Sequence, residues 1–275
     1  MNSDLLSIAL EVATTAAELV ARRRGEGVAV ADRKSSSVDI VTHADRESEA
    51  LIREMLAKLR PGDGFYGEEG SADAAGTDTG TSGLTWVVDP IDGTVNYLYG
   101  IPQYGVSIAV VEGDPDPLTW TALAGVVASP ATGEVFSAAT GSGAWLESAF
   151  LGSSEIHVAA ATPLAEALIG TGFSYSSESR GVQGAVVARL LTEVRDIRRI
   201  GAASLDLCYV ANGRLNAYYE RGLKPWDHAA GALIAREAGA RVAGLDGTPA
   251  DASFLLAAES SVAAALEARL LDLGI

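Results

Sequence analysis

Cysteine is almost absent from this chain, whose 275 residues include only one, Cys208. A single cysteine excludes an intramolecular disulfide, and the start of the sequence lacks the apolar block of a signal peptide. Both observations are typical of a protein of the reducing cytoplasm, and we expect that location. No run of about 18 apolar residues is present either, so we expect no membrane-spanning helix.

Basic residues are also scarce. The chain has 20 Lys and Arg against 36 Asp and Glu, which gives a formal net charge of −16. This charge excludes a general nucleic-acid binder, because affinity for phosphates requires a high density of Lys and Arg. It also repels a phosphorylated substrate unless cations reverse the charge at the site. With 48% hydrophobic residues, the chain can bury a large core.

The spacing of apolar residues predicts a chain in which helices and strands alternate. We expect helices over residues 3–24, 44–59, 183–195, 204–212, 227–238 and 262–271. We expect strands over residues 86–89, 105–111, 123–129, 135–139, 167–171, 215–219 and 254–258. Residues 71–83 have no periodicity and predict an exposed loop or flap. The alternation indicates an α/β protein in which an N-terminal half, residues 1–140, and a C-terminal half, residues 141–275, form one compact unit with a site between them.

The most informative segment is residues 86–96, with the sequence WVVDPIDGTVN. An apolar run with strand character stops at Asp89, and Asp92 follows within a tight turn. Gly93 and Thr94 then open what could be the N-terminus of a helix. Hard cations such as Mg²⁺ prefer carboxylate and carbonyl oxygens, and the amides at a helix start favour phosphate. The segment therefore predicts metal-assisted phosphate chemistry.

Acidic residues elsewhere extend this pattern, although each has a simpler interpretation. Asp45 fits a T-x-x-D capping box, Glu68 can be a solvated loop residue, and Asp227 can cap a helix. Asp89 and Asp92 can be ordinary turn residues. Four carboxylates that converge on one point repel each other strongly unless cations lie between them. We therefore expect Glu68, Asp89, Asp92 and Asp227 to meet at a metal site.

These residues lie in motifs through which the chain resembles the inositol monophosphatase family of metal-dependent, lithium-sensitive phosphatases. The family motif D-P-[IL]-D-G-T-x-N is matched at residues 89–96, and W-D-x-A-[AG]-G is matched at residues 226–231. The element G-E-E is present at residues 67–69, and V-T-x-x-D at residues 41–45. Order and spacing match over nearly the whole chain. The resemblance implies a layered αβαβα sandwich of the inositol monophosphatase and fructose-bisphosphatase type.

The resemblance also implies the metal ligands. Glu68, Asp89 and the backbone carbonyl of Ile91 are expected to hold a first Mg²⁺. A second Mg²⁺ is expected on Asp89, Asp92 and Asp227, and Glu68 is expected to help hold a weaker third ion. Asp92 and Asp227 are expected to contact the substrate as well. Most ligands thus come from the N-terminal half, and Asp227 comes from the C-terminal half.

The same resemblance implies the remaining catalytic roles. Thr94 and Asp45 are expected to orient and deprotonate the attacking water, with Glu68 as a third catalytic residue. The amides of Gly93 and Thr94 are expected to hold phosphate oxygens. Lys34 matches a lysine that the family places near the metals, and a surface lysine is the simpler interpretation. The expected reaction is direct attack of a metal-activated water on the phosphomonoester, without a phosphoenzyme.

For the alcohol side of the substrate, the resemblance points to the C-terminal half. The turn Gly201, Ala202 and Ala203 matches a family turn whose backbone faces substrate hydroxyls, and Ser204 after it is a plausible helix N-cap. Glu220 matches an acid that accepts hydrogen bonds from inositol hydroxyls, with a solvated loop acid as the simpler interpretation. We expect an inositol-1-phosphate phosphatase, with related polyol phosphates as further candidate substrates.

Several alternatives stay open at this point. Fructose 1,6-bisphosphate, histidinol phosphate and 3′-phosphoadenosine 5′-phosphate are substrates of the same chemistry. A non-catalytic partner of the transcription machinery is an alternative from another class. The resemblance further implies a homodimer and inhibition by lithium. We expect neither membrane binding nor direct binding of nucleic acid.

Overall fold

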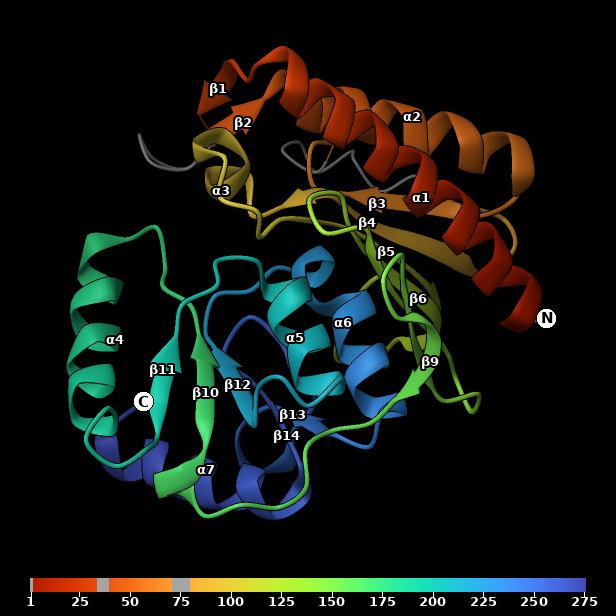
Figure 1. Ribbon diagram of the computed structural model, residues 1–275. Helices are drawn as coiled ribbons and strands as arrows, with labels where there is room; N and C mark the ends of the chain where they lie inside the picture. Colours follow the sequence, from red (N-terminus) through yellow and green to blue (C-terminus); the bar gives the residue numbers. More distant parts are fainter. Residues whose placement is uncertain (1, 34–39, 71–79) are drawn as a thin grey trace.

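The fold is described from a computed structural model that covers residues 2–33, 40–70 and 80–275 (Figure 1). Two long helices open the chain, α1 (Asn2–Glu26) and α2 (His43–Leu59). Both are amphipathic, as the spacing predicted, and α2 buries Ile52 and Leu56. A short antiparallel pair, β1 (Val30–Arg33) and β2 (Ile40–Thr42), leads into α2.

A seven-stranded sheet forms the centre of the N-terminal part. Its strands lie in sequence order, and β3 and β4 are parallel while all other neighbours are antiparallel. The strands are β3 (Gly64–Gly67), β4 (Leu84–Asp92), β5 (Gly105–Glu112), β6 (Thr121–Ser129), β7 (Glu134–Ala139), β8 (Ala144–Ser148) and β9 (Gly152–Ile156). The short helix α3 (Thr94–Tyr99) follows β4.

A five-stranded mixed sheet forms the centre of the C-terminal part, in the order β11-β10-β12-β14-β13. Its strands are β10 (Leu168–Thr171), β11 (Asp196–Arg198), β12 (Ala217–Glu220), β13 (Arg241–Ala243) and β14 (Leu255–Ala258). The helices of this part are α4 (Ser177–Leu190), α5 (Ala203–Ala211), α6 (Pro225–Glu237) and α7 (Ser260–Leu273). Parallel strands β11, β10 and β12 are joined through helices, as parallel pairing requires.

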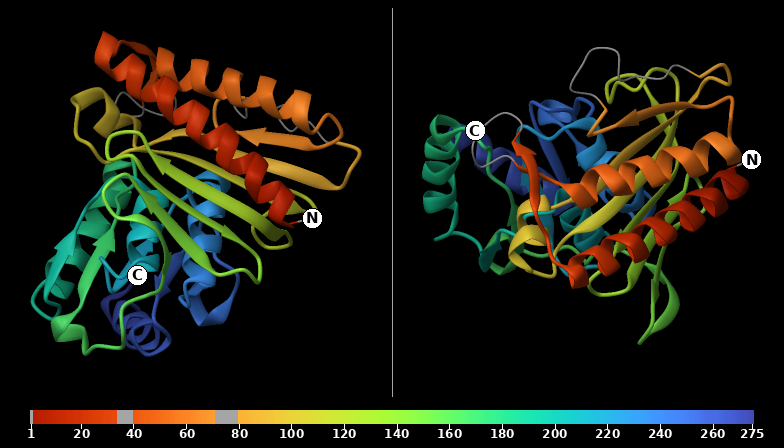
Figure 2. Two further views of the ribbon diagram at one scale, coloured as in Figure 1. Left: turned by 45° about the vertical axis from the view of Figure 1, so that its right-hand side comes forward. Right: turned by 90° about the horizontal axis from the view of Figure 1, so that it is seen from above.

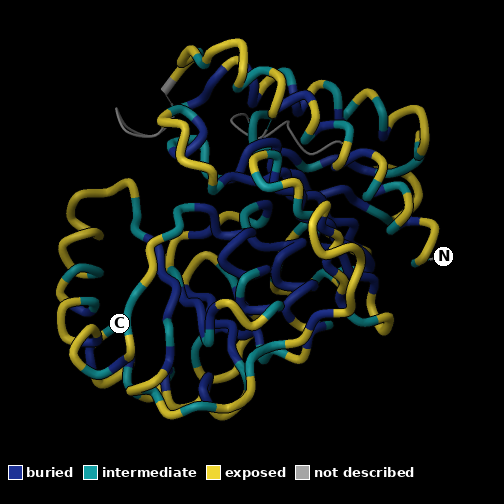
Figure 3. The backbone as a smooth tube through the Cα atoms, viewed as in Figure 1, coloured by how far each residue is buried: buried dark blue, intermediate teal, exposed yellow. Residues whose placement is uncertain are grey.

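These elements stack in five layers (Figures 1 and 2). Helices α1 and α2 cover one face of the seven-stranded sheet, and α5 and α6 lie between the two sheets. Helices α4 and α7 cover the outer face of the five-stranded sheet. Three buried clusters fill the spaces between layers, and the exposed segments of the backbone lie on the outer helices and loops (Figure 3). The expected αβαβα sandwich is confirmed.

Some boundaries differ from the expectations. The helix expected over residues 183–195 is α4, which begins at Ser177 because Ser176 accepts a hydrogen bond from the Ser179 amide, and which ends at Leu190. The division at residues 140 and 141 stays a prediction, and the seven-stranded sheet runs beyond it to Ile156. Within the described part of the chain, no helix combines the length and apolar character needed to span a membrane.

Candidate active site

The candidate site lies where β3 and β4 end. Because these strands are parallel, their carboxyl ends meet at the same edge of the sheet. Glu68 follows β3, and its amide donates to the Val88 carbonyl at 3.2 Å. Asp89 and Asp92 occupy the end of β4, where the pairing with β5 is irregular, and they are only 2% and 8% exposed. The strand end therefore buries two carboxylates beside a third.

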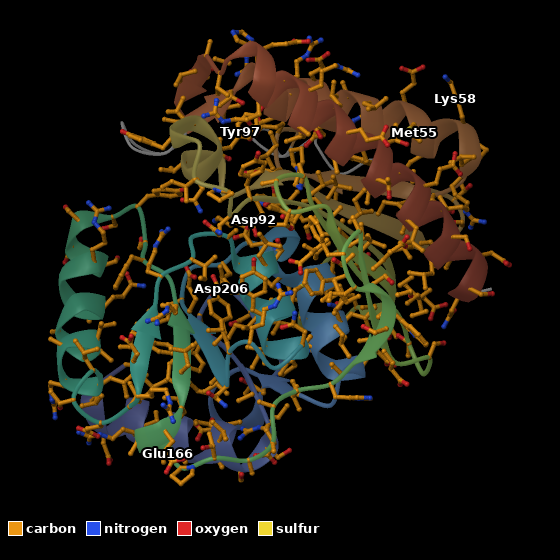
Figure 4. The ribbon with its side chains drawn as sticks, viewed as in Figure 1. Met55, Lys58, Asp92, Tyr97, Glu166 and Asp206 are labelled. Carbon is orange, nitrogen blue, oxygen red and sulfur yellow. The ribbon has the colours of Figure 1, made fainter. Side chains whose placement is uncertain are left out.

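Asp92 connects the two parts of the molecule. Its Oδ2 accepts hydrogen bonds from the Ser204 amide at 2.7 Å and from the Ser204 hydroxyl at 2.5 Å. Ser204 was expected to cap the helix, but α5 has Ala202 at its N-cap, and Ser204 lies inside the first turn. Asp92 thus lies at the junction between the upper layers and α5 (Figure 4).

Asp227 reaches the site from the C-terminal part. The N-cap of α6 is Lys224 rather than Asp227, which lies in the first turn after Pro225. Its carboxylate accepts a hydrogen bond from the Lys224 amide at 2.6 Å. Pro225 suits the first helical position because that residue needs no intrahelical N–H bond. The expected cap residue therefore stabilises the helix start from inside the first turn.

Electrostatic interactions connect the four carboxylates. Burial raises the pKa of Asp89 well above its usual value, and three neighbouring carboxylates raise it further, those of Glu68, Asp92 and Asp227. Burial and the charges of Asp92 and Glu68 likewise raise the pKa of Asp227. The structure therefore brings together the four acidic residues that the sequence predicted to meet. Such a group of buried and half-buried, mutually repelling carboxylates is stabilised by a bound cation.

The donor set consists of oxygen atoms only, which fits a hard divalent cation such as Mg²⁺. Over residues 2–33, 40–70 and 80–275, no three Asp, Glu, His or Cys side chains already stand in coordinating geometry. The carboxylates are oriented instead by protein donors, such as the Ile91 amide, which donates to Asp89 Oδ1 at 3.0 Å. The carboxylate oxygens of these residues suit Mg²⁺ as ligands. Hydrogen bonds from protein donors orient three of the carboxylates, those of Asp89, Asp92 and Asp227.

Thr94 and Asp45 form a second unit beside the carboxylates. The Thr94 hydroxyl lies 3.0 Å from Asp45 Oδ1 and 3.0 Å from the Ile91 carbonyl oxygen. Asp45 completes the expected capping box of α2, because its Oδ2 accepts hydrogen bonds from the Thr42 amide at 2.9 Å and from the Thr42 hydroxyl. Burial raises the pKa of Asp45 to about 6, although the bonds from Thr42 and Thr94 oppose that rise. The capping role of Asp45 is confirmed, and its contact with the Thr94 hydroxyl is compatible with the catalytic role, which stays a prediction.

Two loops approach each other closely at Gly93. Its φ of 89° lies in the left-handed region, and a Cβ atom there would lie 2.9 Å from the Gln103 carbonyl oxygen and 3.1 Å from that of Gly201. Only glycine satisfies both conditions. Asn96 joins the same loops, because its side-chain amide donates to Gln103 at 2.7 Å and to Ile200 at 2.9 Å. The turn of residues 201–203 is thereby held against the β4 motif.

Glu220 ends β12 on the same side of the molecule. Burial raises its pKa to about 7, and the charge of Asp92 adds to the rise, while a bond from Tyr218 and the charge of Arg199 oppose it. Glu220 is therefore not the solvated loop acid of the simpler interpretation.

Sequence reasoning did not find every residue at the site. Tyr218, Asp206 and Glu49 are buried polar residues near the expected site residues, and Asp206 lies below Asp92 (Figure 4). Their signal in the sequence is weak, because Asp206 is a single polar position in an apolar helix, Glu49 is one of several charged residues in α2, and Tyr218 stands beside a second tyrosine. Cys208 is buried and free, as expected for a core residue. Lys34 and residues 71–79 of the expected flap lie outside the described residues.

Comparisons with known proteins agree with this geometry. A sequence model of the inositol monophosphatase family matches residues 1–273. A curated relative, inositol-1-monophosphatase SuhB of Mycobacterium tuberculosis, is 48% identical over 247 residues, which are 86% of this chain and 83% of the relative. Another, named Nus factor SuhB, from Xylella fastidiosa, is 37% identical over 252 residues, 91% of this chain and 85% of the relative.

A solved structure, that of Mycobacterium tuberculosis SuhB, has the same fold. It superimposes with a TM-score of 0.82 at 43% identity and covers 100% of this chain and 98% of its own. The family match over nearly the whole length and the common fold agree with the motifs around Asp89 and Asp227. The chain belongs to the inositol monophosphatase family of phosphoric monoester hydrolases.

Proposed function

We propose that this chain hydrolyses inositol 1-phosphate, and to some extent related polyol phosphates, in a Mg²⁺-dependent reaction. The observation that carries the proposal is the group of four carboxylates from both parts of the chain beside the Thr94 hydroxyl. An acidic group of this kind has no structural benefit of its own, because like charges at short range repel.

The proposed metal ligands are those that the family resemblance implies. Glu68, Asp89 and the Ile91 carbonyl oxygen would hold one Mg²⁺. Asp89, Asp92 and Asp227 would hold a second Mg²⁺, and Glu68 would contribute to a weaker third site. When bound, the metals supply the positive charge that neutralises phosphate and favours deprotonation of water.

Thr94 and Asp45 orient the attacking water. A hydroxyl has one hydrogen and two lone pairs, so Thr94 can donate to Asp45 Oδ1 and accept from a water at the same time. Asp45 is held rigidly by Thr42, and its raised pKa suits a group that receives a proton near neutral pH. The water then attacks phosphorus directly, the bond between phosphorus and the inositol oxygen breaks, and that oxygen takes up a proton, so that inositol leaves as the alcohol. No protein side chain becomes phosphorylated.

The remaining contacts bind the two ends of the substrate. The amides of Gly93 and Thr94 lie at the start of α3, where the first N–H groups have no intrahelical acceptor, and we assign them to phosphate oxygens. Backbone groups of Gly201, Ala202 and Ala203 face the alcohol, and Ala202 contributes no hydroxyl. Glu220 accepts hydrogen bonds from ring hydroxyls. A site built in this way rejects analogues that lack those hydroxyls.

The test is phosphate release with Mg²⁺ from four substrates in parallel, inositol 1-phosphate, fructose 1,6-bisphosphate, 3′-phosphoadenosine 5′-phosphate and histidinol phosphate. We expect a preference for inositol 1-phosphate that is lost in Asp92→Asn. Reaction in ¹⁸O-labelled water should place the label in the released phosphate. Preference for another substrate would contradict the assignment of Glu220, and a trapped phosphoenzyme would contradict direct attack.

A second candidate is a non-catalytic partner of the transcription machinery, because one relative is named a Nus factor. The intact set of carboxylates favours catalysis, since a scaffold has no use for it. Co-purification of RNA polymerase with an inactive Asp92→Asn variant would favour this second candidate. From the resemblance we also propose a cytoplasmic homodimer that lithium inhibits and that binds neither membranes nor nucleic acid.

A further inference from the structure

Strand β12 presents two kinds of side chain on its two faces. Ala217 and Tyr219 pack into the cluster beneath α4 and α7, and Tyr219 stacks on Phe254 with ring centroids 6.5 Å apart. Tyr218 packs into the cluster around α5 and α6 on the opposite face. Because side chains alternate along a strand, Glu220 projects to the same face as Tyr218. The two adjacent tyrosines therefore lie on opposite faces of β12, and only Tyr218 shares a face with Glu220.

Tyr218 makes a direct contact with Glu220. The phenolic O–H donates to Glu220 Oε2 at 2.5 Å, a length typical of a charge-assisted bond. Tyr218 is 0% exposed, and burial raises its pKa well above the usual value, so the phenol stays protonated and acts as the donor. A fully buried ring has few rotamers available, and the donor is therefore fixed in position.

The neighbouring strand β10 leads to the backbone that lies on the other side of the Glu220 carboxylate. Strand β10 lies parallel to β12 (Figure 1). In this pairing Gly170 is opposite Tyr218, and Gly172 follows two residues later. A Cβ atom on Gly172 would overlap the carboxylate of Glu220, and one on Gly170 would lie 2.9 Å from Asp206 Oδ1. Glycine at both positions leaves space for two carboxyl groups on this face of the sheet. The Glu220 carboxylate therefore lies between the Gly172 backbone and the Tyr218 hydroxyl.

We propose that Tyr218 and Gly172 are positioning residues that set substrate selectivity by holding the Glu220 carboxylate in one orientation. The Tyr218 hydroxyl donates to Glu220 Oε2, and Glu220 Oε1 accepts a hydrogen bond from a hydroxyl of a polyol phosphate. This inference rests on the proposed function, because it deepens the role assigned to Glu220. A fixed acceptor discriminates between substrates better than a mobile one, because less conformational freedom is lost on binding.

The experiment compares Tyr218→Phe with its strand neighbour Tyr219→Phe, which removes the same hydroxyl on the opposite face. The readout is the ratio of kcat/KM for inositol 1-phosphate to kcat/KM for p-nitrophenyl phosphate, which has no ring hydroxyls. We expect this ratio to fall about tenfold in Tyr218→Phe, the scale of one hydrogen bond to a charged group, and to stay unchanged in Tyr219→Phe. Equal ratios in the two variants would overturn the inference.

A double-mutant cycle separates positioning from general structural damage. Glu220→Gln alone should lower the same ratio, and adding Tyr218→Phe to it should cause no further fall, because Tyr218 acts through Glu220. Independent, additive effects would overturn the inference while leaving the role of Glu220 intact. An unchanged ratio in Glu220→Gln would overturn both the role of Glu220 and the inference.

A glycine pair provides a second, independent test. Gly172→Ala should lower the selectivity ratio, because the new methyl group displaces the Glu220 carboxylate. Gly181→Ala in α4 is the matched control, since a Cβ atom there meets nothing within 4 Å. Far-ultraviolet circular dichroism and thermal unfolding identify variants that fail to fold. A folded Gly172→Ala protein with the wild-type ratio would contradict the role of Gly172.

Discussion

At the residue scale, the Thr94 hydroxyl is the side-chain group best placed to orient a water. It lies 3.0 Å from both Asp45 Oδ1 and the Ile91 carbonyl oxygen. We expect Thr94→Ala to lower kcat about 100-fold, the scale of a lost proton-transfer group, and Thr94→Ser to keep most of it. Steady-state kinetics on inositol 1-phosphate measures both. A fully active Thr94→Ala protein would contradict the role of the hydroxyl.

The sequence alone could predict some of these placements. Asp89 and Asp92 follow an apolar strand, and Asp45 follows a capping-box pattern, so local chemistry was sufficient for them. The bond between Ser204 and Asp92 could not be predicted, because 112 residues separate the partners and a serine at a helix start has an ordinary local role as cap. Contacts between distant residues depend on packing, which local patterns do not encode.

At the element scale, helix α2 clamps the loop that carries Glu68. Glu49, which is 5% exposed, accepts a hydrogen bond from the Glu69 amide at 2.7 Å. Arg53 donates to Glu49 at 3.3 Å and lies 4.0 Å above the Phe65 ring. The loop approaches the helix closely, because a Cβ atom on Gly70 would lie 2.8 Å from the Arg53 guanidinium.

We therefore expect Glu49→Gln to weaken Mg²⁺ binding about tenfold, the scale for residues that hold metal ligands in place. The change replaces a charged acceptor by a neutral one and loosens the loop around the proposed ligand Glu68. Titration calorimetry with Mg²⁺ measures the effect without relying on activity. Glu54→Gln, an exposed position on the same helix, is the control. Equal affinities in the two variants would refute the clamp.

The end of α2 is tied to β4 through Asp63. Its carboxylate accepts bonds from Arg60 at 2.8 and 3.1 Å and from the Trp86 indole at 2.9 Å. Burial raises the pKa of Asp63, but bonds from Arg60, Ser82 and Trp86 outweigh it and leave the pKa below 3.8. A lowered pKa contributes stability that is complete above the unfolded-state value and is lost as the pH falls below it.

We expect Asp63→Asn to lower the free energy of unfolding by about 2 kcal/mol at neutral pH, the scale of bonds to a charged group. The difference from wild type should shrink as the pH falls from about 4 through the lowered pKa of folded Asp63, because the carboxylate is protonated first in the unfolded state and then in the folded state. Urea unfolding at neutral pH and at a pH below about 4 measures the difference in the free energy of unfolding. Asp196→Asn, in an exposed pair with Arg198, should change little. A difference that is independent of pH would rule out a charge effect.

Elements differed in how well their sequence revealed them. Long amphipathic helices and fully apolar strands were predicted, because their periodicity is strong. The strands β8 and β9 were missed, and β9 is exposed over most of its length, so no apolar pattern marks it. Short strands such as β11 and β13 depend on neighbouring strands rather than on their own sequence.

At the scale of the whole molecule, α6 packs tightly on the seven-stranded sheet. A Cβ atom on Gly125 of β6 would lie 3.0 Å from the Ala230 backbone, so helix and strand meet without an intervening side chain. We expect Gly125→Ala to destabilise the protein by about 1–3 kcal/mol, the cost of overpacking a dense core. Thermal unfolding measures this, with Gly184→Ala, an open position in α4, as the control. Unchanged stability in Gly125→Ala would contradict the close packing of α6 on β6.

The layered arrangement is also what assembles the site, since Asp227 comes from α6 and the other acidic residues come from the strand ends above it. The overall architecture followed from the alternation of helices and strands together with the family resemblance. The orientation of the carboxylates did not, because it depends on donors such as Ser204 and Lys224 that only the folded chain brings near.

The most direct test of the central claim is phosphate release from inositol 1-phosphate as Mg²⁺ is titrated into protein stripped of metal with a chelator, for wild type and Asp89→Asn. Asp89 is the carboxylate whose pKa is raised by the charges of the other three. We predict no release without Mg²⁺, saturable release with it, and loss of that response in Asp89→Asn. Release that persists in the chelator, or a wild-type response in Asp89→Asn, would contradict the account.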